Sequence, residues 1–485
     1  MKGFESVIGL EIHAQLLTRS KLFCGCGTGF GAEPNTQVCP VCLGLPGALP
    51  VLNRRAVELA VLVGEALHAH TNTSSVFARK NYFYPDLPKN YQISQFDRPL
   101  CSGGHLYVSD GGKRRRVRVT RVHLEEDAGK SVHLDDAGGR RTLVDFNRCG
   151  VPLIEIVTEP ELRSPSEAHA LLKALKQILE YTGASSGNME EGGLRCDVNV
   201  SLRRVGERAL GSKTEIKNLN SFRNVERALE YEIERQAGLL AGGTAVLNET
   251  LMWDAGRDRA VSMRSKEEAH DYRYFPEPDL LRLELKGDWI DDVKSRLPEL
   301  PEARESRFVE SLGLPPYDAA VLCGRRALAD YFEEVARLTG EPKSASNWIM
   351  TEVLRTAKEG ATDEFPVTAA NLADLLTLVR SGRISGKMAK DVFARMAGTG
   401  ETADDAVSRM GLRQVTDVRE MRTIVDAVLS ENPKSVADYA RGKKKLFGFL
   451  MGRIMEKTAG QASPTLAESV LRERLEGVRE GDANT

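Results

Sequence analysis

The chain has 485 residues, of which 41% are hydrophobic and 28% are charged, and its formal net charge is −2. These are ordinary values for a globular protein, and the length predicts two to four domains. No apolar run approaches the roughly 18 residues of a membrane helix, and the first ten residues lack a signal-peptide core. We therefore expect a cytoplasmic protein without a membrane segment, on which any nucleic-acid surface is local.

Four short segments before about residue 290 alternate polar and apolar residues. A period of two is typical of β-strands that bury one face. The segments are residues 7–13, 117–124, 153–157 and 196–202. They predict a largely antiparallel sheet with one apolar and one polar side.

Helices are predicted between and after these strands. Ser164 and Glu167 have the spacing of a capping box around Pro165 and begin a helix that Gly183 ends. Residues 224–237 form a second helix. After two proline-rich segments, at 297–301 and 313–316, the pattern is almost entirely helical. Helices are expected to begin at 367–368 and at Ser435, with breaks at 398–400 and 432–433.

The expected fold class is therefore α+β. We predict a β-rich domain with flanking helices over 1–292, an all-α helical domain over 293–405 and a small helical tail domain over 406–485.

Four of the eight cysteines lie in two close pairs: Cys24 and Cys26, then Cys39 and Cys42. Two loops that each offer two sulfurs can complete a tetrahedral zinc site. Such a site has no open position, so it would be structural rather than catalytic. The alternative is four reduced cysteines without a metal.

Acidic residues and one histidine form a second candidate site. Glu11 and His13 share a strand face, Glu125 and Glu126 end another strand, and Glu155 interrupts an apolar strand. A buried unpaired carboxylate is costly, so Glu155 needs a cation or hydrogen-bond donors. Carboxylates with one imidazole suit magnesium or manganese. The alternatives are a surface ion pair for Glu11 with His13, and a structural pair of Glu155 with an arginine such as Arg148.

Positive charge occurs beside aromatic residues at 79–84 and 89–92, and again at 441–449. Cations placed this way can bind phosphates while rings stack on a base, and clustered cations suit a phosphate backbone. A packed loop with solvated charges and a solvated helix end are the alternatives. There is no Walker A loop and no amidase-type glycine–serine run. Any ATP site would therefore be unusual, and any ammonia would come from elsewhere.

Taken together, long segments of this sequence resemble the B subunit of aspartyl/glutamyl-tRNA amidotransferases, the GatB family. The segments that carry the resemblance are 7–13, 79–86, 91–97, 123–130, 145–160 and 271–279. The resemblance implies a catalytic cradle domain over 1–292 with a zinc-binding insertion near 24–42. It also implies a YqeY-like helical region formed by the last two domains.

The reaction that the resemblance implies is an ATP-dependent carbon–nitrogen ligation. Mg-ATP phosphorylates the side-chain carboxylate of Glu-tRNA(Gln) or Asp-tRNA(Asn), and ammonia from glutamine displaces the phosphate. A partner amidase, the A subunit, would supply the ammonia through a channel, and a small C subunit would complete a heterotrimer.

The resemblance also implies roles for particular residues. The magnesium ligand candidates are Glu11, His13, Glu126 and Glu155, with Glu125 as a substitute, and the catalytic candidates are Glu126, Glu155 and Lys89. Lys80, Arg148 and Tyr82 are the cofactor-binding candidates, and Lys89 with Glu126 could gate the ammonia. Zinc would be held by Cys24, Cys26, Cys39 and Cys42, and tRNA by Arg441, Lys443, Lys444 and Lys445.

Two other functions remain open at this point. One is a scaffold that holds tRNA while all chemistry occurs in a partner; an ionisable residue in an apolar strand, Glu155, argues against it. The other is a zinc hydrolase, which the closed four-cysteine site disfavours.

Overall fold

The computed structural model describes residues 3–136, 139–265, 272–356, 364–415, 417–458 and 460–482. Contacts divide the chain into two compact units, Met1–Ala303 and Arg304–Thr485. In the described residues no helix is long and apolar enough to cross a lipid bilayer.

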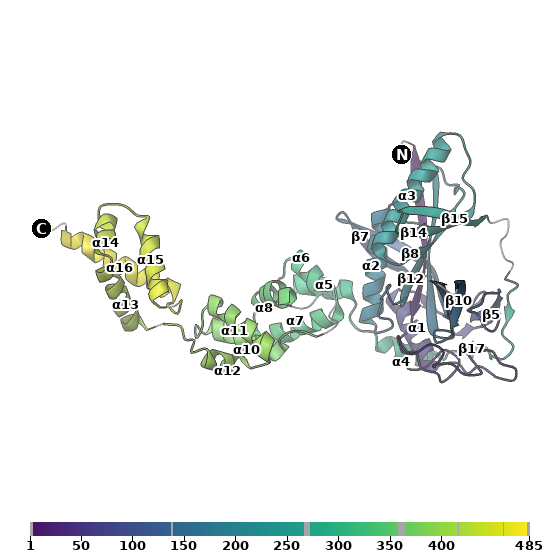
Figure 1. The fold of residues 1–485 in the computed structure, drawn as a ribbon, viewed down its shortest axis with the longest axis horizontal. Coiled ribbons are helices and arrows are strands. Elements are labelled where there is room, and N and C mark those ends of the chain that lie inside the picture. Colours follow the sequence, from purple (N-terminus) through teal and green to yellow (C-terminus); the bar gives the residue numbers. More distant parts are fainter. Residues whose placement is uncertain are drawn as a thin grey trace. The chain divides into compact units, whose positions relative to one another are not determined.

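A sheet forms the centre of the first unit (Figure 1), and ten strands belong to it among the described residues. Its main path runs through β15 (Arg259–Ser265), β14 (Glu249–Asp254), β13 (Thr214–Leu219), β12 (Leu194–Arg204), β1 (Phe4–Gln15), β11 (Pro152–Thr158), β8 (Lys113–Glu126), β6 (Cys101–Ser102) and β2 (His70–Thr71), and β7 (His105–Asp110) pairs with β8. Every neighbouring pair is antiparallel except β13 with β14. The predicted α+β class with a largely antiparallel sheet is confirmed.

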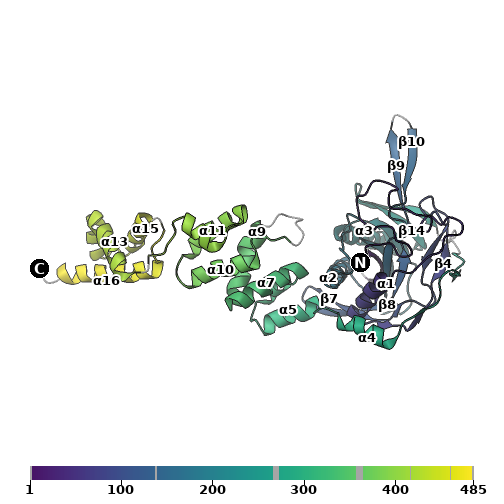
Figure 2. The same cartoon turned by 90° about the horizontal axis from the view of Figure 1, so that it is seen from below.

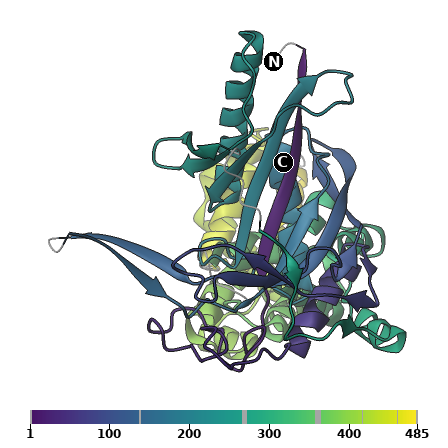
Figure 3. The ribbon, with the colours of Figure 1, turned by 90° about the vertical axis from the view of Figure 1, so that its right-hand side faces the viewer.

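Strand β1 crosses the middle of this sheet (Figure 3) and contains the first predicted alternating segment. Its residues Ile8, Leu10 and Ile12 are buried in the main core, where each such side chain stabilises the fold by about 1.5–3 kcal/mol. The core also includes residues of α1 (Arg54–Ala66), α2 (Pro165–Tyr181) and α3 (Phe222–Ala241). The other face of the strand is left for polar side chains.

Helix α2 begins as the sequence predicts, but only half of the capping box forms. Ser164 Oγ accepts a hydrogen bond from the Glu167 backbone N–H at 3.1 Å, and Pro165 occupies the first turn. The Glu167 carboxylate accepts instead from the backbone N–H of Arg163 at 2.7 Å and pairs with Arg115. The Glu167 carboxylate therefore contacts Arg163 and Arg115 instead of the backbone N–H of Ser164.

Shorter strands surround the central sheet. They form a three-stranded sheet of β16 (Phe275–Pro276), β4 (Ala78–Asn81) and β5 (Tyr91–Ser94), a pair of β17 (Leu283–Glu284) with β3 (Ser74–Ser75), and a hairpin of β9 (Lys130–Asp136) with β10 (Gly139–Asp145). The hairpin projects from the rest of the unit (Figure 2). Helix α4 (Gly287–Ser295) follows.

Helices make up the rest of the described chain. They are α5 (Pro301–Glu310), α6 (Pro316–Leu322), α7 (Arg326–Thr339), α8 (Pro342–Trp348), a π-helix (Ile349–Val353), α9 (Leu354–Thr356), α10 (Ala369–Arg380), α11 (Gly386–Thr399), α12 (Ala403–Arg409), α13 (Val418–Glu431), α14 (Pro433–Ala440), α15 (Leu446–Lys457) and α16 (Pro464–Asp482). Two apolar clusters lie among them, one from Phe308 to Val407 and one from Val415 to Leu475. The domain boundaries predicted near residues 292 and 405 remain predictions.

Three of the predicted helix limits can be compared directly. Thr368 caps α10, and Gly400 ends α11 with a φ of 73°, as expected. Helix α14 begins at Pro433, two residues before the predicted start at Ser435. The proline suits the first helical turn because it lacks a backbone N–H that would otherwise be unpaired there.

Candidate functional site

The register of three neighbouring strands brings acidic and histidine residues onto one face. His13 of β1 is opposite Glu155 of β11, and Glu155 is opposite His123 of β8. Opposite residues of antiparallel strands project to the same side. Glu11 and Glu125 share that side because each lies two residues from a histidine of the group.

These side chains approach one another closely. His13 Nε2 lies 3.5 Å from Glu125 Oε1 and 3.5 Å from Glu155 Oε2. It lies 3.7 Å from Glu11 Oε1. His123 Nε2 lies 3.3 Å from Glu155 Oε2 and 3.8 Å from Glu125 Oε2. Two possible ligand groups result, Glu11–His13–Glu155 and His123–Glu125–Glu155, and Glu155 belongs to both. We call these five residues the acidic cluster.

The electrostatics of the acidic cluster favour a bound cation. Burial lowers the pKa of His123, but the charge of Glu155 and hydrogen bonds to Glu125 and Glu155 outweigh it and raise the pKa to about 9. Burial also lowers the pKa of His13, but a hydrogen bond with Glu155 and the charge of Glu125 outweigh burial and raise this pKa above its ordinary value. Burial and the charge of Glu155 raise the pKa of Glu11. The three carboxylates thus favour the protonated form of both imidazoles, and a divalent metal could take the place of those protons.

The donor set fits magnesium or manganese. Hard carboxylate oxygens with one or two imidazole nitrogens match the preference of these ions. The His123 and Glu125 side chains are each only 3% exposed, so few water molecules could stabilise the charges. Buried Nδ1 of His123 has no hydrogen-bond partner among the described residues.

Glu126 lies outside the acidic cluster, and its predicted role as a magnesium ligand stays a prediction. Its carboxylate accepts hydrogen bonds from Lys89 Nζ and, at 2.9 Å, from the backbone N–H of Ile93. Glu125, expected only as a substitute, occupies the place beside His13. The physical reason is the alternation of a strand, which sends consecutive side chains to opposite sides. The pairing expected for Lys89 with Glu126 is present and buried.

A pocket of about 510 Å³ adjoins the polar face of the sheet. Its lining includes Arg195 and Asp197 of β12, which are opposite His13 and Glu11 in the register of β1 with β12. Arg195 and Asp197 project to the side of the sheet that carries the acidic cluster, so this part of the pocket wall lies beside the cluster. It is large enough for part of a nucleotide or an aminoacyl group.

Arg148 lines this pocket but is not the partner of Glu155. Its guanidinium donates hydrogen bonds to the carbonyl oxygens of Ala128 at 3.0 Å and Gly129 at 2.6 Å. The arginine beside Glu155 is Arg121, at 3.3 Å. The structural pair considered for Arg148 is thus absent from the described geometry.

Lys80 and Tyr82 lie together at the end of β4. Lys80 Nζ is 5.8 Å from the centre of the Tyr82 ring and 5.0 Å from that of Tyr272. Burial would lower the pKa of Lys80, but the charge of Glu125 raises it above its ordinary value. The charged form of Lys80 is therefore favoured, and its ammonium group lies beside two aromatic rings.

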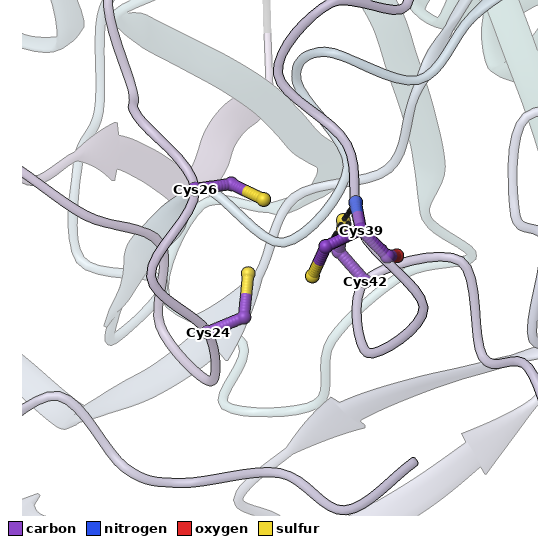
Figure 4. Close-up of side chains that lie close together, drawn as sticks. All are labelled: Cys24, Cys26, Cys39 and Cys42. Atoms are coloured by element: carbon purple, nitrogen blue, oxygen red, sulfur yellow. Dashed lines mark hydrogen bonds between the residues drawn. The ribbon is translucent and has the colours of Figure 1, made fainter.

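The four predicted zinc ligands also converge (Figure 4). Cys24 and Cys26 come from one loop and Cys39 and Cys42 from the next, and their sulfur atoms all lie within 4.8 Å of one another. All four are free cysteines. The hydrogen bond from Cys24 lowers the pKa of Cys42 to about 4. Four sulfur donors at this spacing fit a structural zinc ion.

Lys21 is a buried cation beside these cysteines. It is fully buried, and its Nζ donates to Gln37 O at 2.6 Å and lies 3.6 Å from Cys42 Sγ. A four-thiolate zinc centre carries a net charge of about −2, so an adjacent ammonium group would offset part of it.

Comparison with known proteins matches most of this chain to one protein family. Residues 6–291 match the family described as the GatB/GatE catalytic domain, and residues 330–475 match the GatB domain family. The B subunit of the aspartyl/glutamyl-tRNA(Asn/Gln) amidotransferase of Moorella thermoacetica is 53% identical over 474 residues, 97% of this chain and all of the relative. The proteins of the same name from Geobacter sp. and Thermodesulfovibrio yellowstonii are each 52% identical, over 98% and 96% of this chain and 100% and 98% of their own lengths. This chain belongs to the GatB family.

The basic residues expected to bind tRNA lie in the GatB domain, between α14 and α15. All four are exposed. Lys443 Nζ lies 2.8 Å from Asp438 Oδ2, and Arg441 is 3.9 Å from the same carboxylate group. Lys444 and Lys445 complete the group, so this end of α14 presents clustered positive charge.

Sequence reasoning missed three residues that the structure brings to these candidate sites. His123 was recognisable, because it precedes Glu125 by two residues in an alternating strand. Lys21 and Arg121 were not, since each acts through partners more than 15 residues away, Cys42 and Glu155. Asp271, in the family-like segment 271–279, lies outside the described residues.

Proposed function

We propose that this chain activates the side-chain carboxylate of Glu-tRNA(Gln) or Asp-tRNA(Asn) for amidation. The acidic cluster carries the proposal, because it gathers ionisable groups in a buried place beside a pocket. The curated relatives are named as subunits of an amidotransferase, which supports the same reaction class. The whole enzyme is an ATP-dependent ligase that takes its nitrogen from glutamine, and we expect it in the cytoplasm.

The chemistry explains why ATP is required. A carboxylate resists attack because its leaving group would be oxide. In the proposed reaction a carboxylate oxygen accepts the γ-phosphoryl group of ATP, giving ADP and an acyl phosphate. Ammonia then attacks the carbonyl carbon, the bond from that carbon to the phosphate oxygen breaks, and phosphate leaves as the nitrogen loses a proton. Magnesium, when bound, would neutralise phosphate charge during the transfer.

The protein groups have separate roles in this proposal. Glu11, His13, Glu125 and Glu155 would hold magnesium, with His123 as a further ligand or as a positioning group for Glu155. Lys80, Tyr82 and Arg148 are the candidates for contact with the nucleotide. Positioning and charge neutralisation are the main tasks of a phosphoryl-transfer site, and this set of groups suits both.

Lys89 and Glu126 are the proposed gate for ammonia. They form a buried pair that lines a pocket of about 110 Å³. Its other lining residues include Cys24 and Cys42 of the proposed zinc site. A partner amidase, the A subunit, would supply the ammonia, and a small C subunit would complete the heterotrimer. Zinc would keep the wall of this pocket in place, and the basic end of α14 would bind tRNA.

A direct assay tests the proposal. The chain is combined with its amidase partner, glutamine, labelled Glu-tRNA(Gln) and Mg-ATP, and both Gln-tRNA(Gln) and ADP are measured. We expect Glu155→Gln and Glu125→Gln to reduce both products by at least 100-fold, in line with the loss of charge stabilisation at the reacting phosphate. Glu284→Gln, in the short strand β17, is a matched control that should retain activity.

The same assay judges the scaffold alternative. A protein that only holds tRNA would retain amide formation in both cluster variants. Gathering three carboxylates in a buried place costs free energy, and holding tRNA does not require such a cluster, which favours the catalytic interpretation over the scaffold. Full activity of both variants would refute our proposal.

A further inference from the structure

Five aromatic rings form a continuous run at the edge of the three-stranded sheet. The rings of Phe96 and Tyr274 stack with centres 4.0 Å apart and planes at 6°. Edge-to-face contacts of 6.0 Å then connect Tyr274 with Tyr272, Tyr272 with Tyr82, and Tyr82 with Tyr84. The segment 272–274 comes from far along the chain, yet the hydrogen bond from the Asn81 N–H to Tyr272 O holds it beside β4 at 3.0 Å. We call these five residues the aromatic run.

The aromatic run begins next to the acidic cluster. Ser94 Oγ lies 3.4 Å from Glu125 Oε2, and Phe96 is two residues further along the chain, which is at most about 7 Å of backbone. Lys80 connects the two features as well, because its ammonium group lies over Tyr82 and Tyr272 and is influenced by the charges of Glu125 and Glu155. A group bound on Phe96 would therefore lie within one nucleotide's length of the proposed reaction centre.

Both ends of the aromatic run are open to solvent. Phe96 is 48% exposed and Tyr84 is 52% exposed, and the neighbouring Phe83 is 71% exposed. The inner tyrosines are half-buried and serve the packing of this region. The exposed rings lie at the ends of one contiguous run rather than scattered singly, and contiguous exposed apolar surface is typical of an interaction site.

We infer that the Phe96 end of the aromatic run binds the unpaired 3′ end of the aminoacyl-tRNA, with its terminal base stacked on the open face of Phe96. This inference rests on the proposed function. The amino acid is esterified to the terminal ribose, so the terminal base must lie close to wherever the side-chain carboxylate reacts. Aromatic side chains stack on bases of any sequence, which suits a single-stranded end.

Substitution of Phe96 tests the inference in the assembled enzyme. Phe96→Leu keeps apolar bulk but removes the ring, whereas Phe96→Tyr keeps the ring. With ammonium chloride as nitrogen donor, we expect Phe96→Leu to raise the KM for Glu-tRNA(Gln) roughly ten-fold, since one base stack is lost. Phe96→Tyr should stay within about two-fold of the wild type, and the KM for ATP should not change in either variant.

A binding measurement that needs no turnover complements the kinetics. A tRNA with 2-aminopurine in place of its terminal adenine should lose fluorescence on binding the wild-type complex, because stacking quenches this base. Quenching should persist with Phe96→Tyr and disappear with Phe96→Leu, while both variants keep the melting temperature of the wild type. Tyr274→Leu should also weaken quenching, because Tyr274 supports the Phe96 ring.

The outcomes separate this inference from the proposed function. If the wild type forms amide and Phe96→Leu leaves the KM for tRNA unchanged, the inference is wrong and the function stands. A rise in the KM for ATP alone would assign the rings to the nucleotide and overturn the inference. If wild-type amide formation itself is absent, the proposed function fails, and the quenching measurement still decides whether the rings bind the tRNA end.

Discussion

Glu125 and Glu126 are consecutive residues with different partners. Glu125 Oε1 lies 3.5 Å from His13 Nε2, whereas Glu126 accepts hydrogen bonds from Lys89 and from the backbone N–H of Ile93. The last two residues of β8 thus belong to two sites, the proposed magnesium site and the proposed ammonia gate.

Metal affinity should therefore differ between two otherwise identical substitutions. Glu125→Gln removes a charged ligand, and we expect it to weaken Mn²⁺ binding, measured by titration calorimetry, by at least ten-fold. Glu126→Gln changes the same group one residue away and should leave the affinity within about two-fold. An equal loss of Mn²⁺ affinity in both variants would contradict the proposal that Glu125, rather than Glu126, is the metal ligand.

The Lys89–Glu126 pair should show strong coupling in stability. Removing one member of a buried ion pair leaves an uncompensated charge, which costs about 3–5 kcal/mol. We expect Lys89→Met and Glu126→Gln each to lower the free energy of unfolding by roughly this amount in urea titrations. The double variant should be more stable than the sum of the single effects predicts. Additive losses would show that the two side chains act independently.

Zinc retention should depend on Lys21 as well as on the cysteines. Cys39→Ser removes a ligand and should abolish stoichiometric zinc in the purified protein, measured by metal analysis. Lys21→Met removes only the adjacent charge and should weaken zinc binding about 10- to 100-fold in competition with a chelator. Lys113→Met, at an exposed position, is the control. A wild-type protein without zinc would remove the metal proposal altogether, and a Lys21→Met protein with normal affinity would remove only the role of Lys21.

The basic end of α14 should contribute to tRNA affinity in a salt-dependent way. Lys444→Ala with Lys445→Ala removes two exposed cations, and we expect the slope of log K against log salt to fall by about one to two. Lys286→Ala, before α4, provides a control that removes a lysine elsewhere on the surface. Filter binding at several salt concentrations measures both. An unchanged slope in the double variant would place the tRNA contact elsewhere.

Much of the fold was predictable because its signals are local. Alternation within 7–13, 117–124, 153–157 and 196–202 identified β1, β8, β11 and β12, and the Ser164 cap identified the start of α2. Helix α14 begins two residues earlier than the sequence predicts, because Pro433 is both a break after α13 and the first residue of α14. Its fixed φ makes it equally suited to a first helical turn.

The sequence by itself determined which side chains share a face within one strand, because a period of two is a property of the extended backbone. It also determined the cysteine quartet, since all four ligands lie within 19 residues of chain. Only the tertiary structure decided that His13, Glu155 and His123 lie side by side, that Glu126 turns to Lys89, and that Tyr274 stacks on Phe96. Those neighbours are separated by dozens to more than a hundred residues, and strand pairing over such distances depends on the packing of the whole sheet rather than on any local pattern.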